Sequence, residues 1–333
     1  MPSPLAPALV DALRDIRLSA DGCAAAVGPR SVDGDSPREL QQRLGAALYE
    51  VCHTGRAEAG PRTRRLVLRD PDFERALEAA LPHRKVHRSG VLLRAPLGEG
   101  TRGREAGGRG GDGGDGGEAI VSWDGVRVRV PARSFGEQGP LVPGAAVSHR
   151  VSPARPALSP GFFYAMGSRE PSLDGELLRV YVHISAPEHA PGLWGAVLGA
   201  LEDAGAHYHA KVLSNRDEYP RRDALVVYLG SESWRACHTV AGAVRGVPGT
   251  GEDVSVFAHR LGPGAAVAWE PDDPRPGAGG LSFGQHRAAA LAEAVVRLSG
   301  GGDMEAAARA FTEAGADPLA PYRNSGSPEL PGR

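Results

Sequence analysis

Lysine is almost absent from this 333-residue chain, which has only Lys85 and Lys211 among its 38 lysines and arginines. A guanidinium stays protonated at any working pH, whereas an ammonium in a desolvated pocket can lose its proton and act as a base. Lys211, in the segment HYHAKVLSNRDEYPRRDALVVYL, is therefore a candidate catalytic base. The alternative is a lysine that only extends its charge to solvent.

Cysteine, long apolar runs and an excess of charge are also scarce. The three cysteines, Cys23, Cys52 and Cys237, form no close pair, which argues against a disulfide framework and a thiolate zinc site. No apolar run is long enough to cross a bilayer, and the N-terminus lacks the pattern of a signal peptide. The formal net charge of -2 gives no overall field for nucleic acid or anionic membranes. We expect a cytoplasmic protein without nucleic-acid or membrane partners.

The spacing of apolar residues predicts an α+β fold in three parts. We expect a helical lobe over residues 1–97, a Gly-rich flexible loop over 98–118, and an α+β lobe over 119–333. The last part begins with a hairpin, and its strands form a mixed or antiparallel sheet packed with helices. The loop contains a Gly-x-Gly-x-x-Gly match, but more glycine follows where a dinucleotide site needs a helix, so a linker is favoured.

A polar strand face supplies the first candidate site. The segment LLRVYVHIS alternates strictly, which predicts that one face carries Arg179, Tyr181, His183 and Ser185. If the neighbouring segments pair with this strand, Lys211 and the cluster Arg221-Arg222-Asp223 join that face. Such a surface suits a phosphate, because arginine grips it bidentately while lysine and histidine move protons. The alternative is the solvated face of an antiparallel sheet.

The sequence GLSFG at residues 280–284 matches the nucleophile elbow of serine hydrolases. That motif needs a buried strand upstream, and EPDDPRPGAGG cannot form one. We instead predict that Ser282 and Gln285 form the capping box of a helix. His286 and Arg287 then fall in its first turn, where the backbone amides favour an anion, so this helix start is a second candidate phosphate site.

No metal or organic cofactor is predicted. His207 and His209 share one face of a predicted strand, but the spacing indicates no third ligand, so a surface or core role is favoured. A Gly-x-x-x-x-Gly-Lys loop and the protein-kinase motifs are also missing. The chain therefore does not look like an enzyme that installs a phosphate.

Five segments, taken in order, resemble one family. They are ALSPGFFYAMG, LLRVYVHIS, HAKVLSNRDEYPRRDALVVYL, LSFGQHRAAALAEAV and DPLAPYRNSGS, with a weaker likeness in LGAALYEVCHTG. This set resembles the HopA-type effector-like proteins encoded beside class V lanthipeptide and thioamitide precursors. The resemblance covers about residues 158–327.

The resemblance implies a lyase that acts on phosphoserine and phosphothreonine in a precursor peptide and yields dehydroalanine or dehydrobutyrine. It implies as partners the phosphorylated precursor peptide, a separate Ser/Thr phosphotransferase and a cyclase. We assign the predicted helical lobe as the candidate for recognition of the leader peptide.

That family in turn is similar to the bacterial phosphothreonine lyases, which carry Lys-x-His on one strand, a second lysine on the next and an arginine beyond. Here Tyr181 stands where the first lysine would be, followed by His183. Lys211 corresponds to the second lysine and Arg222 to the phosphate-binding arginine.

The resulting hypothesis is a β-elimination. Lys211 removes the Cα proton, and His183 or His286 protonates the leaving phosphate. Arg222 and Arg287 hold the phosphate, assisted by the remaining predicted site residues: Arg179, Arg221, Tyr181 and Tyr228. The competing hypothesis is a non-catalytic partner that presents the peptide to a phosphotransferase or cyclase through an exposed sheet edge.

Overall fold

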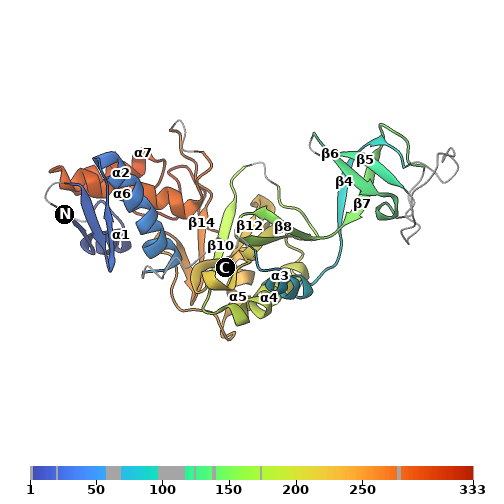
Figure 1. Cartoon of the computed structure of the whole chain (residues 1–333), viewed down its shortest axis with the longest axis horizontal. Coiled ribbons are helices and arrows are strands. Elements are labelled where there is room, and N and C mark those ends of the chain that lie inside the picture. Colours follow the sequence, from blue (N-terminus) through green and yellow to red (C-terminus); the bar gives the residue numbers. More distant parts are fainter. Residues whose placement is uncertain are drawn as a thin grey trace. The chain divides into compact units, whose positions relative to one another are not determined.

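A computed structural model describes residues 3–19, 22–57, 69–96, 117–123, 125–136, 140–172, 175–275 and 279–332. The chain divides into two compact units, one formed by Met1–Pro82 with Ala154–Arg333 and the other by His83–Pro153. Figure 1 shows the course of the chain through both units. Each unit has a hydrophobic core of its own.

A seven-stranded antiparallel sheet forms the centre of the larger unit, with the strand order β13-β14-β10-β12-β11-β9-β8. Its strands are β8 (Ala154–Ser159), β9 (Phe162–Met166), β10 (Leu178–Ile184), β11 (Tyr208–Leu213), β12 (Arg221–Leu229), β13 (His259–Gly262) and β14 (Ala265–Trp269). Almost all residues of the central strands β10 and β12 are buried, on both faces, because the sheet is covered on both sides.

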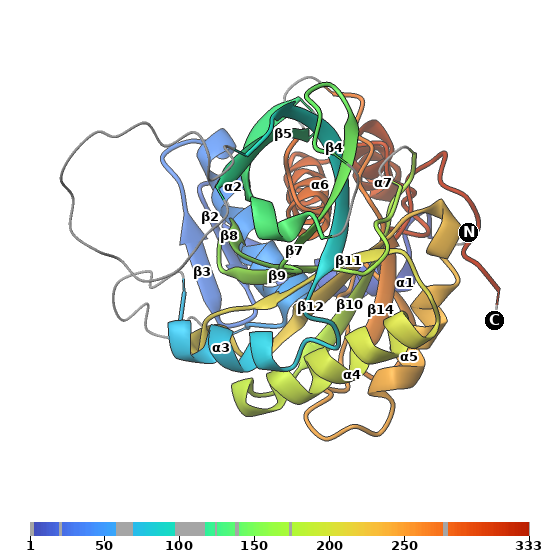
Figure 2. The same ribbon diagram turned by 90° about the vertical axis from the view of Figure 1, so that its right-hand side faces the viewer.

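Helices cover both faces of this sheet. Against one face lie α3 (Pro71–Ala79), α4 (Ala190–Asp203) and α5 (Ala236–Val244), which Figure 2 shows beneath the strands. The other face receives α2 (Pro37–Leu48), α6 (Phe283–Ser299) and α7 (Met304–Glu313). The helix α1 (Pro7–Arg14) and the three-stranded sheet of β1 (Ile16–Leu18), β2 (Ala24–Val27) and β3 (Arg30–Asp33) contribute to this second core.

The smaller unit is a four-stranded antiparallel sheet with the order β6-β5-β4-β7. Its strands are β4 (Val86–Arg94), β5 (Glu118–Trp123), β6 (Val126–Pro131) and β7 (Ala146–Val151). One face packs into a small core that contains Leu92, Val121 and Val147. The hairpin predicted at the start of residues 119–333 is confirmed, since β5 and β6 pair with Trp123 opposite Val126.

The predicted α+β class is confirmed, but the chain divides at other positions than expected. Residues 1–97 contain strands as well as helices, and α2 and α3 pack on opposite faces of the large sheet instead of forming a helical lobe. The expected boundary at 97/98 falls within the smaller unit. Most of the Gly-rich segment, residues 98–116, lies outside the described residues. The strand β13 begins only at His259, and Val256 upstream of it donates a backbone hydrogen bond to the carbonyl oxygen of Cys52.

The core of α4 provides a test of this packing. Leu193 is 0% exposed, whereas Leu319 is 61% exposed. We expect Leu193→Ala to lower the free energy of unfolding by about 2–5 kcal/mol, because it removes buried methyl groups and leaves a cavity. Leu319→Ala, the matched control, should change it by less than about 0.5 kcal/mol. Urea unfolding measures both, and equal effects would contradict the burial described here.

Candidate functional site

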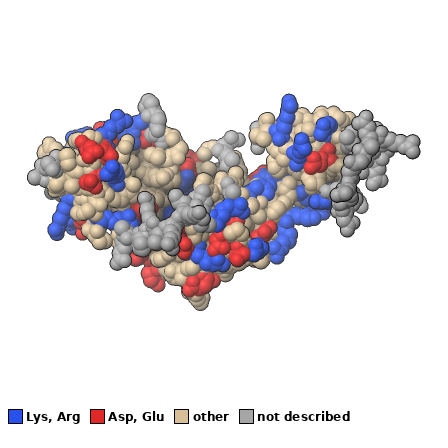
Figure 3. Space-filling model, viewed as in Figure 1, with Lys and Arg blue, Asp and Glu red and all other residues tan. Residues whose placement is uncertain are grey.

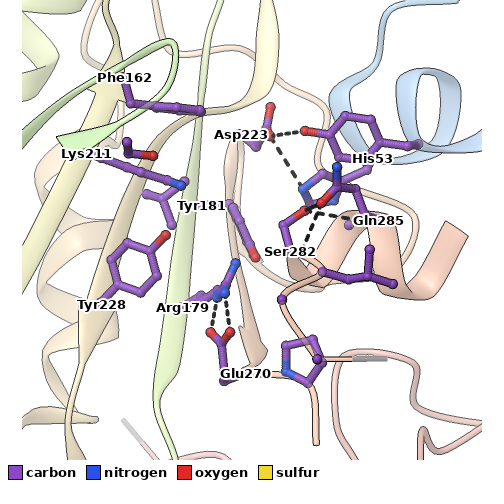
Figure 4. A pocket seen from close by; sticks show the side chains of 18 of the residues that line it. His53, Phe162, Arg179, Tyr181, Lys211, Asp223, Tyr228, Glu270, Ser282 and Gln285 are labelled. Carbon is purple, nitrogen blue, oxygen red and sulfur yellow. Dashed lines mark hydrogen bonds and ion pairs between the residues drawn. The ribbon is translucent and has the colours of Figure 1, made fainter. Parts of the chain in front are cut away.

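One cavity of about 850 Å³ opens on the face of the large sheet that also carries α2 and α6. Figure 4 shows that side chains from the strands and from the start of α6 line it together. The polar lining residues are Tyr49, His53, Ser159, Arg179, Tyr181, Lys211, Asp223, Tyr228, Glu270, Asp272, Asp273, Ser282 and Gln285. All of them belong to the larger unit.

The pairing register brings the predicted strand residues together. Tyr181 on β10 lies opposite Val226 on β12, which lies opposite Lys211 on β11. In the next row, Arg179 lies opposite Tyr228. Directly opposed side chains are neighbours on the same face, so the sheet places Lys211, Tyr181, Arg179 and Tyr228 in two adjacent rows of the cavity floor.

Lys211 lies against aromatic rings. Its Nζ is 4.4 Å from the centre of the Phe162 ring and 5.7 Å from that of Tyr228. The side chain is half-buried, and within the described ranges it forms no hydrogen bond or ion pair. Lys211 is therefore an amine of the cavity that pairs with no carboxylate of the described residues.

Arg179 and the two tyrosines form the opposite side of this floor. The guanidinium of Arg179 makes a bidentate ion pair with Glu270 and lies 5.2 Å from the ring centre of Tyr228. The hydroxyl of Tyr181 is buried near the Arg179 guanidinium and makes no well-formed hydrogen bond with the described residues. Burial raises the pKa of Tyr181 well above its usual range, although Arg179 opposes this. Tyr181 is therefore a protonated hydroxyl available to a ligand.

A π-helix, η1 (Tyr49–Thr54), adds two residues that the sequence reasoning missed. Tyr49 and His53 stack on each other with ring centres 5.5 Å apart, and His53 packs edge-on against Tyr181. Single π-turns inside helices are frequent at functional sites. The helix α6 can approach the His53 ring closely because residue 284 is glycine, where a Cβ atom would lie 2.2 Å from that ring.

A buried polar network holds His53 in place. Its Nδ1 lies 2.8 Å from Ser255 Oγ, and its Nε2 lies 3.6 Å from Asp223 Oδ2. Arg221 makes a bidentate ion pair with Asp223 at 2.7 and 2.8 Å and donates to the Tyr49 hydroxyl at 2.8 Å. Arg221 is thereby committed to Asp223 and does not line the cavity.

Burial sets the protonation of this network. It lowers the pKa of His53 from 6.5 to about 4, more than the nearby Asp223 carboxylate raises it, so His53 is neutral at neutral pH. Burial opposes ionisation of Asp223, yet the Arg221 guanidinium holds the pKa of that carboxyl well below its usual range. The network therefore presents a neutral imidazole beside a neutralised ion pair.

The first turn of α6 forms another wall of the cavity. The predicted capping box is confirmed: Ser282 accepts from the backbone of Gln285, whose side chain accepts from the backbone of Ser282. Both residues and Gly284 line the cavity. The positive end of the helix dipole therefore faces the cavity, where it favours an anion.

Most carboxylates in the lining are already paired. Glu270 is neutralised by Arg179, Asp223 by Arg221, and Asp273 by Arg275, while His286 contacts the same Asp273 carboxylate. Asp272 is exposed. Within the described ranges, no group of three or more His, Cys, Asp or Glu residues could hold a metal ion.

Besides Arg221, two predicted strand residues, His183 and Arg222, lie outside the lining. His183 does not line the cavity. Its ring packs over Gly251, and its Nδ1 lies 3.0 Å from the carbonyl oxygen of Asp253. Arg222 instead lies against Gly55 and pairs weakly with Asp253 at 3.5 Å. The register of β10 and β12 shifts after Val182, and this irregularity turns Asp223, not Arg222, into the cavity.

The predicted pair at the start of α6 is buried behind the cavity wall. His286 contacts Asp273 at 2.8 Å, and burial lowers its pKa. Arg287 is 0% exposed and donates to the carbonyl oxygens of Pro321 and Arg323 and to Asn324. These bonds tie the C-terminal segment to α6, so Arg287 is a structural residue here and neither side chain lines the cavity.

The missed residues left only partial signals in the sequence. His53 lies in the segment LGAALYEVCHTG, and Asp223 is predicted only as a member of the cluster with Arg221 and Arg222, without a role of its own. Glu270 directly follows the buried strand β14, and its side chain forms the ion pair with Arg179. No local pattern links residues 49 and 53 to β12, because that contact is made across more than 150 residues of chain.

The fold and the cavity define an α+β protein with a polar pocket on one face of an antiparallel sheet. The model of the HopA1 effector protein family matches residues 153–323, just over half of the chain. The chain therefore belongs to the HopA1 effector protein family. No curated protein sequence matches it.

Two solved structures from Pseudomonas syringae are similar to this chain. The effector protein of pathovar tomato strain DC3000 is 19% identical, with a TM-score of 0.39, over 49% of this chain and 62% of that one. The effector protein of pathovar syringae strain 61 is 14% identical, with a TM-score of 0.45, over 85% of this chain and 95% of that one. The chain thus spans less than two thirds of the first of these relatives. No helix in the described ranges is long and apolar enough to cross a membrane.

The buried imidazole predicts a loss of stability in acid. Between about pH 6.5 and pH 4 the unfolded chain protonates His53 while the folded protein does not, so the free energy of unfolding falls as the pH falls. The His53 contribution lost by pH 4 is about 3 kcal/mol. Asp223 adds a loss in the same direction, but below the usual carboxyl pKa.

Urea unfolding across this pH range measures the effect. His53→Gln should flatten the pH dependence between pH 6.5 and pH 4, whereas the same change at exposed His259 should leave it unaltered. An unchanged slope in His53→Gln would show that His53 is not held neutral by the fold.

Proposed function

We propose that this protein is a lyase that eliminates phosphate from phosphoserine or phosphothreonine in a peptide. The observation that carries the proposal is the position of Lys211: an amine without a carboxylate partner among the described residues, in a cavity that also holds Arg179, two tyrosines and a helix N-terminus. A base and an anion-binding wall in one pocket are the two requirements of this reaction.

The anion-binding wall receives the phosphate. The first-turn amides of α6 and the Arg179 guanidinium supply donors, and the buried Tyr181 hydroxyl is a further donor. Arg179 contributes with reduced charge, because it shares its donors with Glu270. The family resemblance supports a phosphorylated substrate.

The chemical step is a β-elimination. The neutral amine of Lys211 takes the proton from Cα, the electron pair forms the Cα–Cβ double bond, and the Cβ–O bond breaks with its electrons on phosphate. Tyr228, whose ring lies between Lys211 and Arg179, donates a proton to the departing oxygen. The proton donors predicted from the sequence, His183 and His286, do not line the cavity.

The product is dehydroalanine or dehydrobutyrine within the peptide. A separate phosphotransferase supplies the phosphorylated side chain, since the sequence contains neither a Gly-x-x-x-x-Gly-Lys loop nor the protein-kinase motifs. By the family resemblance, the peptide is a lanthipeptide-type precursor, and a cyclase then adds a cysteine thiol to the double bond.

Replacement of Lys211 by arginine separates catalysis from binding. Arginine keeps the positive charge but cannot become a neutral base. We expect Lys211→Arg to lower turnover of a phosphothreonine peptide about 10²–10⁴-fold while its affinity for that peptide stays within a few-fold. The control is the chain's other lysine: Lys85→Arg should leave turnover unchanged.

Mass spectrometry of the peptide gives the readout. Elimination removes phosphoric acid and leaves an unsaturated residue, hydrolysis returns the hydroxyl, and a non-catalytic binding partner leaves the mass unchanged. Full turnover by Lys211→Arg would refute the role of Lys211 as the base. A peptide that binds but keeps its mass would favour the presentation hypothesis over the lyase.

Removal of the Tyr228 hydroxyl tests the proton donor. Tyr228→Phe keeps the ring beside Lys211 but removes the O–H group, so we expect kcat to fall about 10²-fold with little change in KM. Tyr322→Phe, a partly buried tyrosine outside the cavity lining, is the matched control. A rise in KM at unchanged kcat would assign Tyr228 to binding alone.

A further inference from the structure

Positive charge is concentrated in the smaller unit. Residues 83–153 contain 11 Lys and Arg against seven Asp and Glu, whereas the rest of the chain contains 27 and 33. Among the described residues of this unit, eight are basic and Glu118 is the only acidic one. Figure 3 shows Lys and Arg side chains over the visible side of the unit, with few acidic side chains beside them.

Three of these basic residues, on β4 and β6, lie on the sheet face opposite the core. The register aligns Arg94 on β4 with Ile120 on β5 and Arg129 on β6. One row further along, Ser122 lies opposite Arg127. All three arginines are exposed, and only Arg129 has a described carboxylate partner, Glu118, at 3.6 Å. A face with this excess of cations repels itself and attracts a polyanion.

The edge strand β6 adds geometry to this charge. It pairs only with β5 in the described sheet, and its sequence VRVRVP alternates valine with arginine. Arg127 and Arg129 point to the basic face, while Val126, on the other face, is 62% exposed. An edge strand with no second partner among the described strands is a template for an added strand.

The aromatic residues argue against nucleic acid. Single-stranded nucleic acid is bound through exposed aromatic rings on which bases stack. The unit has two aromatic residues, Trp123 and Phe135, and both pack in its core against buried His149. An acidic peptide needs no stacking platform, because it pairs its backbone with β6 and its carboxylates with the arginines.

We propose that the β6 edge of this unit binds an extended acidic peptide segment by strand addition. Side chains in an added strand alternate between the two faces. Acidic residues at every second position therefore meet Arg127 and Arg129, and the residues between them lie beside Val126 and Val128. The inference does not depend on the lyase reaction, and the family match begins only at residue 153, where this unit ends.

Fluorescence anisotropy on the full-length protein tests this binding. The probe is a labelled peptide of alternating Glu and Thr. We expect binding that weakens as the salt concentration rises from about 0.05 to 0.5 M. The double variant Arg127→Ser/Arg129→Ser should weaken it about tenfold. A double variant at two exposed arginines of the larger unit, Arg38→Ser/Arg309→Ser, should bind as the unchanged protein does.

Two further probes separate strand addition from charge alone. The same peptide N-methylated at alternate residues cannot donate to the edge and should bind at least about tenfold more weakly. A single-stranded oligonucleotide of equal charge should bind more weakly than the unmodified peptide. Circular dichroism confirms that the variants are folded, and Lys211→Ala should bind the peptide normally.

The proposal is overturned by any of three results. These are normal binding by the Arg127→Ser/Arg129→Ser variant, equal binding of the N-methylated peptide, or tighter binding of the oligonucleotide. The last would identify a nucleic-acid surface. Failure here leaves the lyase assay unaffected, because that assay reports on the cavity of the larger unit.

Discussion

The antiparallel register of β10, β12 and β11 is the constraint on which the candidate site depends. It aligns Tyr181 with Lys211 across Val226, and Arg179 with Tyr228. The opposite faces of these strands are fully buried against α3, α4 and α5. A shift of one residue would turn valines into the cavity and the charged side chains into the core, so packing on one face fixes the chemistry on the other.

Ion pairing then decides which charges remain available. Charges are costly to bury without a partner, and the fold meets this by pairing Arg221 with Asp223 and Arg179 with Glu270. Lys211 stands apart, with aromatic rings and no described carboxylate beside it. Lys211, the single lysine of the sheet, is thus also an amine of the cavity that pairs with no described carboxylate.

Segments from two distant parts of the chain complete this cavity. The family match covers the sheet and α6, yet Tyr49 and His53 come from a π-helix upstream of it. Gly284 allows α6 to approach that π-helix closely enough for the His53 ring to pack on it. The smaller unit, His83–Pro153, lies in the sequence between the π-helix and the residues of the family match, and it forms a core of its own.

The sequence by itself determined the features that depend on local spacing. Alternation placed Arg179 and Tyr181 on one face, and the spacing of Ser282 and Gln285 predicted the capping box. Only the tertiary structure decided that Asp223 and not Arg222 enters the cavity, that Arg287 is buried, and that His53 joins the site. These positions are set by a β-sheet irregularity, a π-helix and contacts between distant segments. None of the three produces a regular spacing of apolar and polar residues in the local sequence.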